Sequence, residues 1–90
     1  TDLKAILDRH GVEEVVICGA MSHMCVDAGA RAASDLGYQC VVVHDACATR
    51  DQEFESAVVP AAQVHAAFMA ALRFGYAKLL STEEYLADKR

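Results

Sequence analysis

The chain has 90 residues, enough for one domain or for part of one. Apolar residues make up 54% of it, above the roughly 45–50% usual in soluble domains, which predicts surfaces that more protein must cover. Its 8 basic and 13 acidic residues give a net charge of -5, which excludes the basic footprint of a nucleic-acid-binding protein. No apolar run approaches the roughly 20 residues of a membrane helix, so no membrane partner is expected.

The four cysteines are Cys18, Cys25, Cys40 and Cys47. Cys18 and Cys40 lie inside apolar, strand-like runs, where a free cysteine behaves as a small hydrophobic residue. We therefore expect reduced thiols, a cytoplasmic protein and, from the polar residues at the start of the chain, no signal peptide. No CxxC motif occurs, so the sequence predicts no metal and no cofactor.

The first half of the chain alternates helical and strand patterns. Apolar residues at helical spacing predict a helix over residues 3–10, with Asp2 as its N-cap. Residues 15–18 form a short β-branched run, which predicts a strand buried on both faces. An alanine-rich stretch predicts a helix over residues 25–36, and Gly37 ends it.

The second half repeats the alternation. Residues 40–44 predict another buried strand, and the polar residues 45–56 predict a loop. A helix is expected from about Pro60 to Phe74, because proline suits a first helical turn. A third strand is expected over residues 76–80, and Ser81–Glu84 has the pattern of a capping box that opens a last helix.

This order predicts an α/β fold with a parallel sheet. Strands that alternate with helices form right-handed βαβ units. The sheet has three predicted strands and the chain four predicted helices, whereas sheets average about five or six strands. The sequence therefore predicts a truncated domain.

The segment after the first predicted strand is the best candidate for chemistry, since ligands of open α/β sheets bind beyond the carboxyl ends of strands. Gly19 lets the chain turn sharply. Cys25 would then begin a helix, where unpaired N–H groups and the helix dipole lower a thiol's pKa and make the thiolate a better nucleophile. The same N–H groups could hold an oxyanion. The alternative is a buried, inert cysteine.

The stretch VVICGAMSHMCVDAGARAASDLGYQCVVVHDACATRD resembles the isochorismatase-like, nicotinamidase-related cysteine hydrolases. The matching pattern is a strand, then G-x-x-(S/T)-x-x-C-V, an alanine-rich helix, L-G-Y and a second strand with D-A. The later HAAFMAALRFGYAKLLSTEEYL resembles the family's closing helix, strand and tail. The resemblance implies a Rossmann-like, three-layer α/β/α fold, of which residues 1–90 would be the C-terminal part of a single domain.

The resemblance also implies a mechanism. Family members hydrolyse small amides, carbamoyl compounds or the vinyl ether isochorismate through a Cys-Asp-Lys triad. By analogy Cys25 is the nucleophile, and the N–H groups of Met21 and Cys25 form the oxyanion hole. The Ala20–Met21 peptide bond would be cis, which outside proline requires a reason in the surrounding structure. Whether the substrate is an amide or a vinyl ether stays open.

The triad's other members are missing from the pattern. In the family the Asp and Lys precede the cysteine by many residues, and neither Asp2, Lys4 nor Lys78 matches their context. We therefore expect the 90-residue chain to be inactive alone, because acid–base partners typically contribute about 10²–10⁴-fold each. The alternative function is a non-catalytic interaction subunit, or a fragment, that docks through apolar helices.

Several other residues are candidates for a supporting role. Ser22, His23 and Asp45 could contact the substrate, although His23 could equally lie in solvent or at a subunit contact, and Asp45 could cap its own turn. Cys47 is the alternative nucleophile. A zinc site is a third hypothesis, and its ligands would be His23, Cys25, His44 and Cys47.

The expected partners are a small-molecule substrate and more protein. The helix that carries His65 is apolar around much of its circumference, which predicts a homo-oligomer contact or packing against a missing N-terminal half. A histidine on such a helix is most often a satisfied core or interface group.

Overall fold

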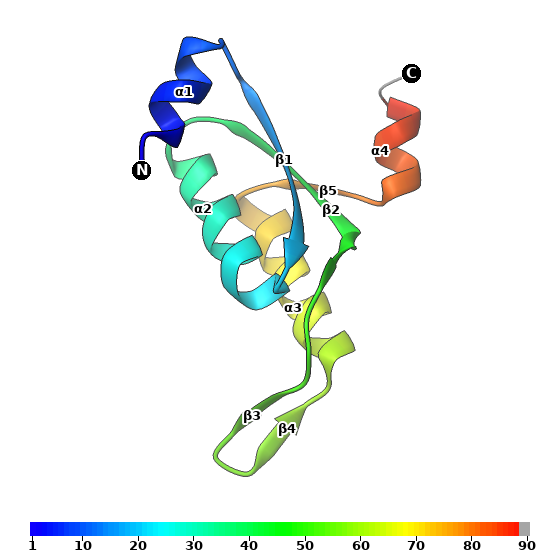
Figure 1. Ribbon diagram of the computed structural model, residues 1–90. Coiled ribbons are helices and arrows are strands. Elements are labelled where there is room, and N and C mark those ends of the chain that lie inside the picture. The colour runs from blue at the N-terminus through cyan, green and yellow to red at the C-terminus, as the bar shows by residue number, and fades with distance from the viewer. Residues whose placement is uncertain (89–90) are drawn as a thin grey trace.

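The computed structural model describes residues 1–88 (Figure 1). Its elements are α1 Leu3–Arg9, β1 Glu14–Ala20, the short π-helix η1 Ser22–Val26, α2 Asp27–Asp35, β2 Gln39–Ala48, β3 Gln52–Phe54, β4 Ala57–Val59, α3 Ala61–Gly75, β5 Lys78–Leu80 and α4 Thr82–Asp88. The predicted alternation of helices and strands is confirmed, and a hairpin of two further strands is added to it.

The main sheet is parallel, with the strand order β1-β2-β5. Figure 1 shows α2 and α3 side by side on one side of these strands and α4 on the other. The predicted three-layer α/β arrangement is therefore confirmed. β-branched runs form β1 and β2, and Leu79 and Leu80 form most of β5, because apolar side chains suit the pleated, half-buried surface between two helical layers.

The core lies between the central strand and two helices. Val42 of β2 is fully buried, and it packs with Val26, Ala30, Met69 and Leu72 from η1, α2 and α3. Each of these side chains removes apolar surface from water at roughly 25 cal/mol per Å². Since Val26 closely follows Cys25, the core fixes one end of the segment that carries the candidate nucleophile.

β1 is not buried on both faces, so that expectation is wrong. It lies at one edge of the described sheet, and most of its residues are exposed. Val16 is 38% exposed, and Cys18 is exposed, whereas its apolar surroundings predict a buried thiol. The apolar run has the composition of a central strand, but only β2 occupies the central position, with Cys40–Val43 buried.

The predicted polar loop after residue 44 is also wrong, because β2 continues to Ala48. The register between β1 and β2 shifts after Ile17 pairs with Val42, and pairing resumes between Gly19 and Cys47. β2 therefore bulges and then runs beside the last residues of β1. The bulge brings residues 47 and 48 next to the point where the chain leaves β1 for Cys25.

A hairpin of β3 and β4 extends away from the body of the molecule (Figure 1). Its turn places Glu55 at φ 52°, in the left-handed region that non-glycine residues rarely adopt. Phe54 and Val58 on this hairpin are 76% and 60% exposed. A polar loop is the natural expectation here because charged residues surround the few apolar ones.

The helix ends confirm one predicted cap and contradict another. At α4, Ser81 N donates to Glu84 Oε1 at 2.8 Å, and Glu84 N donates to Ser81 Oγ at 3.0 Å, which is the predicted capping box. Asp2 makes no side-chain cap at α1; Thr1 Oγ1 accepts a bond from Leu3 N instead.

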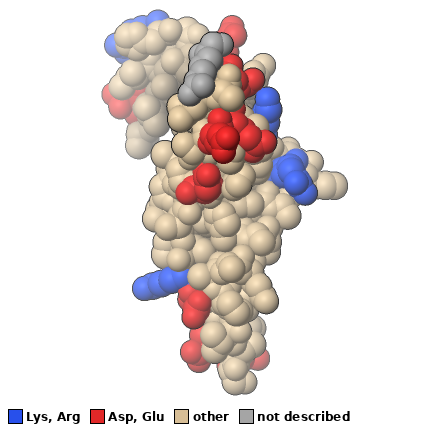
Figure 2. Space-filling view, turned by 90° about the vertical axis from the view of Figure 1, so that its right-hand side faces the viewer, with Lys and Arg blue, Asp and Glu red and all other residues tan. Residues whose placement is uncertain are grey.

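The charged side chains form no basic patch on the face shown in Figure 2. Acidic groups gather there beside α4, whose first turn carries Glu83 and Glu84, and a broad area below them is largely uncharged. Within residues 1–88, no helix combines the length and the apolar character that crossing a membrane requires.

Candidate active site around Cys25

The site begins where β1 ends. Gly19 has φ 132°, a conformation that residues with a Cβ rarely adopt. The peptide bond between Ala20 and Met21 is cis. The chain then enters η1 directly, so the turn places Cys25 at the carboxyl end of β1, the edge where open α/β sheets bind ligands.

The backbone of η1 winds around one carbonyl. The Met21 oxygen accepts bonds from Met24 N at 3.0 Å and from Val26 N at 3.3 Å. Cys25 lies within this turn, just before α2 rather than inside it, and its residue is exposed. Val26 is only 3% exposed. The turn thus presents the Cys25 thiol to solvent while its neighbour is held in the core.

Ser22 is not a surface loop residue. It is fully buried, and its Oγ lies 2.7 Å from His65 Nδ1 on α3, within hydrogen-bond distance. Ser22 therefore lies beneath the turn instead of facing an open substrate loop as expected. Its polar side chain suggests exposure, but a partner 43 positions along the chain satisfies it.

His23 connects the turn to two other segments. Its Nδ1 lies 2.9 Å from Thr49 Oγ1, just after β2, and its ring meets Phe68 of α3 edge-on at 5.9 Å between centroids. The ring is half-buried. Sequence reasoning missed Thr49 because only the bulge in β2 brings this residue to His23.

Cys47 is the weaker of the two candidate nucleophiles. It is half-buried and packs against the core cluster, and its Sγ lies 3.4 Å from the Val43 oxygen. Burial raises the pKa of the Cys47 thiol, outweighing a bond from the Gly19 backbone that lowers it. Because the thiolate is the attacking form, this environment disfavours Cys47 relative to the exposed Cys25.

Asp45 connects β2 to α4. Its Oδ1 accepts bonds from Thr82 N at 2.7 Å and from Thr82 Oγ1 at 2.8 Å. These bonds lower the pKa of Asp45 below its ordinary value. The sequence suggests a cap within the aspartate's own turn, whereas its main partner begins a helix 37 residues later.

The structure does not bring the four ligands of the zinc hypothesis together. Among residues 1–88, no three His, Cys, Asp or Glu side chains are placed to hold one metal ion. His23 is engaged with Thr49, and Cys47 with a backbone oxygen. The ligand set proposed from His23, Cys25, His44 and Cys47 is therefore contradicted within the described residues.

Charged residues that could be mistaken for triad members have other partners. Asp27 follows Cys25 closely, but its Oδ1 binds Arg31 Nε at 2.9 Å. Lys4 binds Asp8 at 2.6 Å on α1, which lies at the opposite end of β1 from the Cys25 turn (Figure 1). Lys78 lies 4.0 Å from Asp88.

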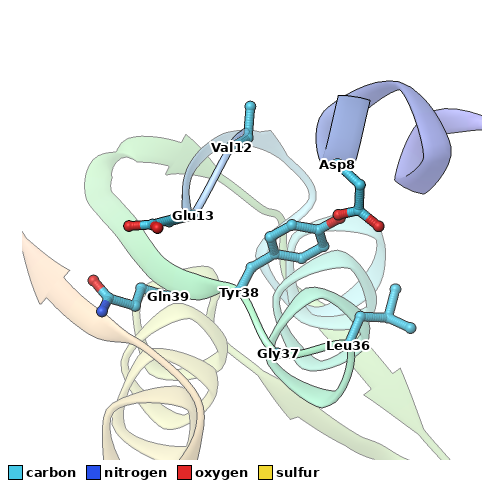
Figure 3. A pocket seen from close by; sticks show the side chains of 7 residues that line it. All are labelled: Asp8, Val12, Glu13, Leu36, Gly37, Tyr38 and Gln39. Atoms are coloured by element: carbon cyan, nitrogen blue, oxygen red, sulfur yellow. The ribbon is translucent and has the colours of Figure 1, made fainter. Parts of the chain in front are cut away.

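A hollow of about 500 Å³ lies at the other end of the sheet, where β1 and β2 begin (Figure 3). The hydroxyl of Tyr38 there donates to the Asp8 carboxylate. This bond and burial raise the pKa of Tyr38, with the bond as the larger cause. Since ligands of such sheets bind at the carboxyl ends of strands, this hollow is not the candidate active site.

Comparison with known proteins finds relatives of one family along nearly the whole chain. Residues 1–84 match the family model of the isochorismatase domain. The uncharacterized isochorismatase family protein YddQ of Bacillus subtilis is 54% identical over 86 residues, 96% of this chain and 48% of that protein. The streptothricin hydrolase of Streptomyces noursei is 53% identical over 51 residues, 57% of this chain and 18% of that protein.

A solved structure of the same family has the same fold. A candidate isochorismatase hydrolase from Oleispira antarctica superposes with a TM-score of 0.91 at 60% identity, over 96% of this chain and 46% of that one. The chain thus spans about half the length of YddQ and of this solved structure. It has the parallel sheet and the glycine-to-cysteine turn that suggested this group, and it belongs to the isochorismatase family.

Proposed function

We propose that this chain is the part of a small-metabolite hydrolase that carries its nucleophile, and that Cys25 is that nucleophile. The observation that carries the proposal is the placement of an exposed thiol in a turn whose flanking residues, Ser22 and Val26, are buried. A fixed backbone with a free side chain is what attack on a bound substrate needs.

The reaction proposed is nucleophilic hydrolysis. For an amide or carbamoyl substrate, the Cys25 sulfur attacks the carbonyl carbon, and the carbonyl electron pair moves to oxygen. The N–H groups of Met21 and Cys25 stabilise that oxyanion. The C–N bond then breaks, and the nitrogen leaves after accepting a proton. Water attacks the resulting thioester, which releases the acid and restores the thiol.

The proton transfers require partners that the proposal places outside this chain. By family resemblance these are an aspartate and a lysine on preceding strands. The candidates within the chain, Lys4 and Asp27, are paired elsewhere. We therefore propose that the 90-residue chain binds or hydrolyses little alone, and that the activity belongs to a larger protein of about twice this length.

Fusion to a relative tests this proposal directly. The part of YddQ that this chain does not cover would be joined to it, and the fusion compared with the chain alone. Release of ammonia from nicotinamide and from carbamoyl compounds reports amide cleavage, whereas release of the keto acid from isochorismate reports vinyl ether cleavage. We expect activity in the fusion only, on one of these two substrate classes.

The nucleophile is tested in the same fusion. Cys25→Ala should lower kcat/KM by more than about 10³-fold, because removal of a nucleophile eliminates the covalent route. Cys47→Ala is the matched control and should retain most of the activity. Equal losses in both variants, or full activity in Cys25→Ala, would show that the nucleophile is assigned wrongly.

Exposed apolar side chains favour one second candidate, a non-catalytic docking role. Phe74 is 95% exposed at the end of α3, and Phe54 is 76% exposed on the hairpin. Apolar side chains this large and this exposed would gain free energy by burial against a partner. Sedimentation of the chain distinguishes the two: a stable homo-oligomer together with an inactive fusion would favour docking over hydrolysis.

A further inference from the structure

His65 is the polar residue of α3 that touches the candidate active site. It lies on a helix whose buried residues are the apolar Val64, Met69 and Leu72, so the helix does not need a histidine to pack. Its Nδ1 is 2.7 Å from Ser22 Oγ. A neutral hydrocarbon side chain would leave the buried Ser22 hydroxyl without this partner.

Ser22 cannot itself be a nucleophile, although a serine beside a histidine invites that reading. The residue is 0% exposed, so no substrate reaches its oxygen. A hydrogen bond to a buried hydroxyl fixes the position of the atoms that make it. The atoms fixed here belong to the first residue of η1, three positions before Cys25.

The turn has a second attachment at the next residue. His23 bonds Thr49 and meets Phe68 edge-on. Val26, at the far end of η1, is anchored in the core. Cys25 therefore lies between buried anchors on both sides, and its backbone N–H has one orientation as long as those anchors hold.

We propose that His65 is a positioning residue for Cys25. It acts through Ser22: the hydrogen bond holds the start of η1, and η1 holds the Cys25 thiol and the N–H groups beside it. The inference rests on the proposed function insofar as it assigns the positioning to catalysis. His65 lies 43 positions after Ser22 in the sequence, so it is not part of the motif that carries the nucleophile.

Three variants of the full chain test the proposal. Ser22→Ala and His65→Leu remove the hydrogen bond, whereas His65→Asn retains an amide group near the position of Nδ1. His10→Leu is the matched control, because it makes the same change at an exposed histidine after α1. The first measurement is the rate of alkylation by iodoacetamide at each cysteine, resolved by peptide mass mapping.

We expect Ser22→Ala and His65→Leu to lower the alkylation rate of Cys25 about three- to tenfold, the usual effect of one hydrogen bond. His65→Asn should restore the rate to within about twofold, and His10→Leu should leave it unchanged. Cys40 and Cys47 report general loosening, since unfolding would make the buried Cys40 and the half-buried Cys47 react faster. A slower Cys25 without a faster Cys40 or Cys47 supports positioning.

Amide hydrogen exchange is the second measurement, and it does not depend on thiol chemistry. The N–H groups of Met24 and Val26, which bond the Met21 oxygen, should exchange faster in Ser22→Ala and in His65→Leu but not in His65→Asn. The N–H of Tyr76, which bonds Leu72 at the end of α3, serves as a reference and should not change.

The outcomes separate the two proposals. If Cys25→Ala leaves the fusion fully active, the proposed function is wrong, and amide exchange alone decides whether His65 holds the turn. If Cys25 is fast and Ser22→Ala leaves both its rate and the Met24 exchange unchanged, the positioning role is wrong. Global unfolding of Ser22→Ala would also overturn it, because the contact would then serve stability.

Discussion

The carboxyl ends of β1 and β2 are paired side by side in the sheet, yet the chain leaves them in opposite ways. β1 ends at Ala20 and turns at once into η1, so Cys25 emerges into solvent. β2 bulges, continues to Ala48 and keeps Cys47 against the core. Both thiols follow an earlier strand cysteine by seven positions, so spacing alone does not distinguish them.

The comparison shows that the backbone after each strand decides the chemistry of its cysteine. A glycine with positive φ and a π-helical turn raise one thiol out of the sheet. The continuing strand β2 leaves the Cys47 thiol against the core, where desolvation raises its pKa. The proposed nucleophile therefore lies where the chain departs from its strand early and is anchored once it has departed.

Competitive alkylation should give the largest difference between the two strand ends. With limiting iodoacetamide near neutral pH, we expect Cys25 to react on the order of 10²-fold faster than Cys47, because Cys25 is exposed and burial raises the pKa of the Cys47 thiol. Peptide mass mapping over time measures the two rates. Urea should abolish the difference, and equal rates in the folded chain would contradict the assignment.

The turn itself can be broken at Gly19. A Cβ at this residue would meet no atom within 4 Å, so the cost of Gly19→Ala comes from its φ of 132°. We expect the free energy of unfolding to fall by about 1–3 kcal/mol, as for other residues in rarely populated backbone conformations. Urea denaturation measures it, alongside Cys25 alkylation, which should slow.

Gly29 of α2 provides the matched control. A Cβ added there would also meet no atom within 4 Å, but its φ is ordinary and it lies in a helix. Gly29→Ala should therefore raise the free energy of unfolding by up to about 1 kcal/mol. If both alanine variants shift stability in the same direction, the backbone conformation of Gly19 is not what the turn depends on.

Local patterns are sufficient to predict the strands of the main sheet, the last capping box and the candidate nucleophile. β-branched and aliphatic runs indicate β2 and β5, and the spacing of Ser81 and Glu84 indicates their reciprocal bonds. Gly19 and Cys25 stand out because a sharp turn and a thiol there have a chemical use. Each of these features depends on residues within a few positions of one another.

Features that depend on distant pairing are not predictable in this way. β2 extends to Ala48 because Gly19 and Ala20 offer it a partner strand, and nothing in the polar sequence after residue 44 shows this. Ser22 is buried because His65 satisfies it, although serine in a turn is usually exposed. The exposure of β1 follows from its edge position, which an apolar run does not reveal.

The hydrogen bond between His23 and Thr49 joins the segments that follow β1 and β2, and its removal should have a smaller effect than the change at Gly19. Thr49→Val eliminates the partner of His23 while it retains the shape of the side chain. We expect the free energy of unfolding to fall by about 0.5–1.5 kcal/mol, the usual net contribution of one hydrogen bond. Ser56→Ala, which removes a hydroxyl from an exposed residue of the hairpin turn, is the control and should have little effect.

A double-mutant cycle isolates this contact. His23→Phe retains a ring against Phe68 but loses Nδ1, so the loss in Thr49→Val should become smaller when His23 is already replaced. Urea titrations of the four proteins give the coupling free energy. A coupling near zero would mean that the ends of β1 and β2 are joined only through the sheet.

The smallest expected effect concerns Asp45, which joins the bulged strand to α4. Bonds from Thr82 lower its pKa below the ordinary value of 3.8, so folding favours the charged form. Its contribution to stability is therefore fully present above that ordinary value and is lost as the pH falls through the lower folded-state pKa. The pKa of Glu84, lowered from 4.5 by bonds with Ser81, acts in the same direction at the same helix.

Asp45→Asn should lower the Tm by a few degrees at pH 7, because the amide accepts the Thr82 bonds without the charge. The gap from wild type should close as the pH falls from 3.8 through the lower folded-state pKa of Asp45, because the wild-type carboxylate then also becomes neutral. Melting curves at several pH values measure this gap, with Glu53→Gln on the exposed hairpin as the control. A gap that stays constant down to the acid limit would show that the charge of Asp45 does not hold α4 to the strand.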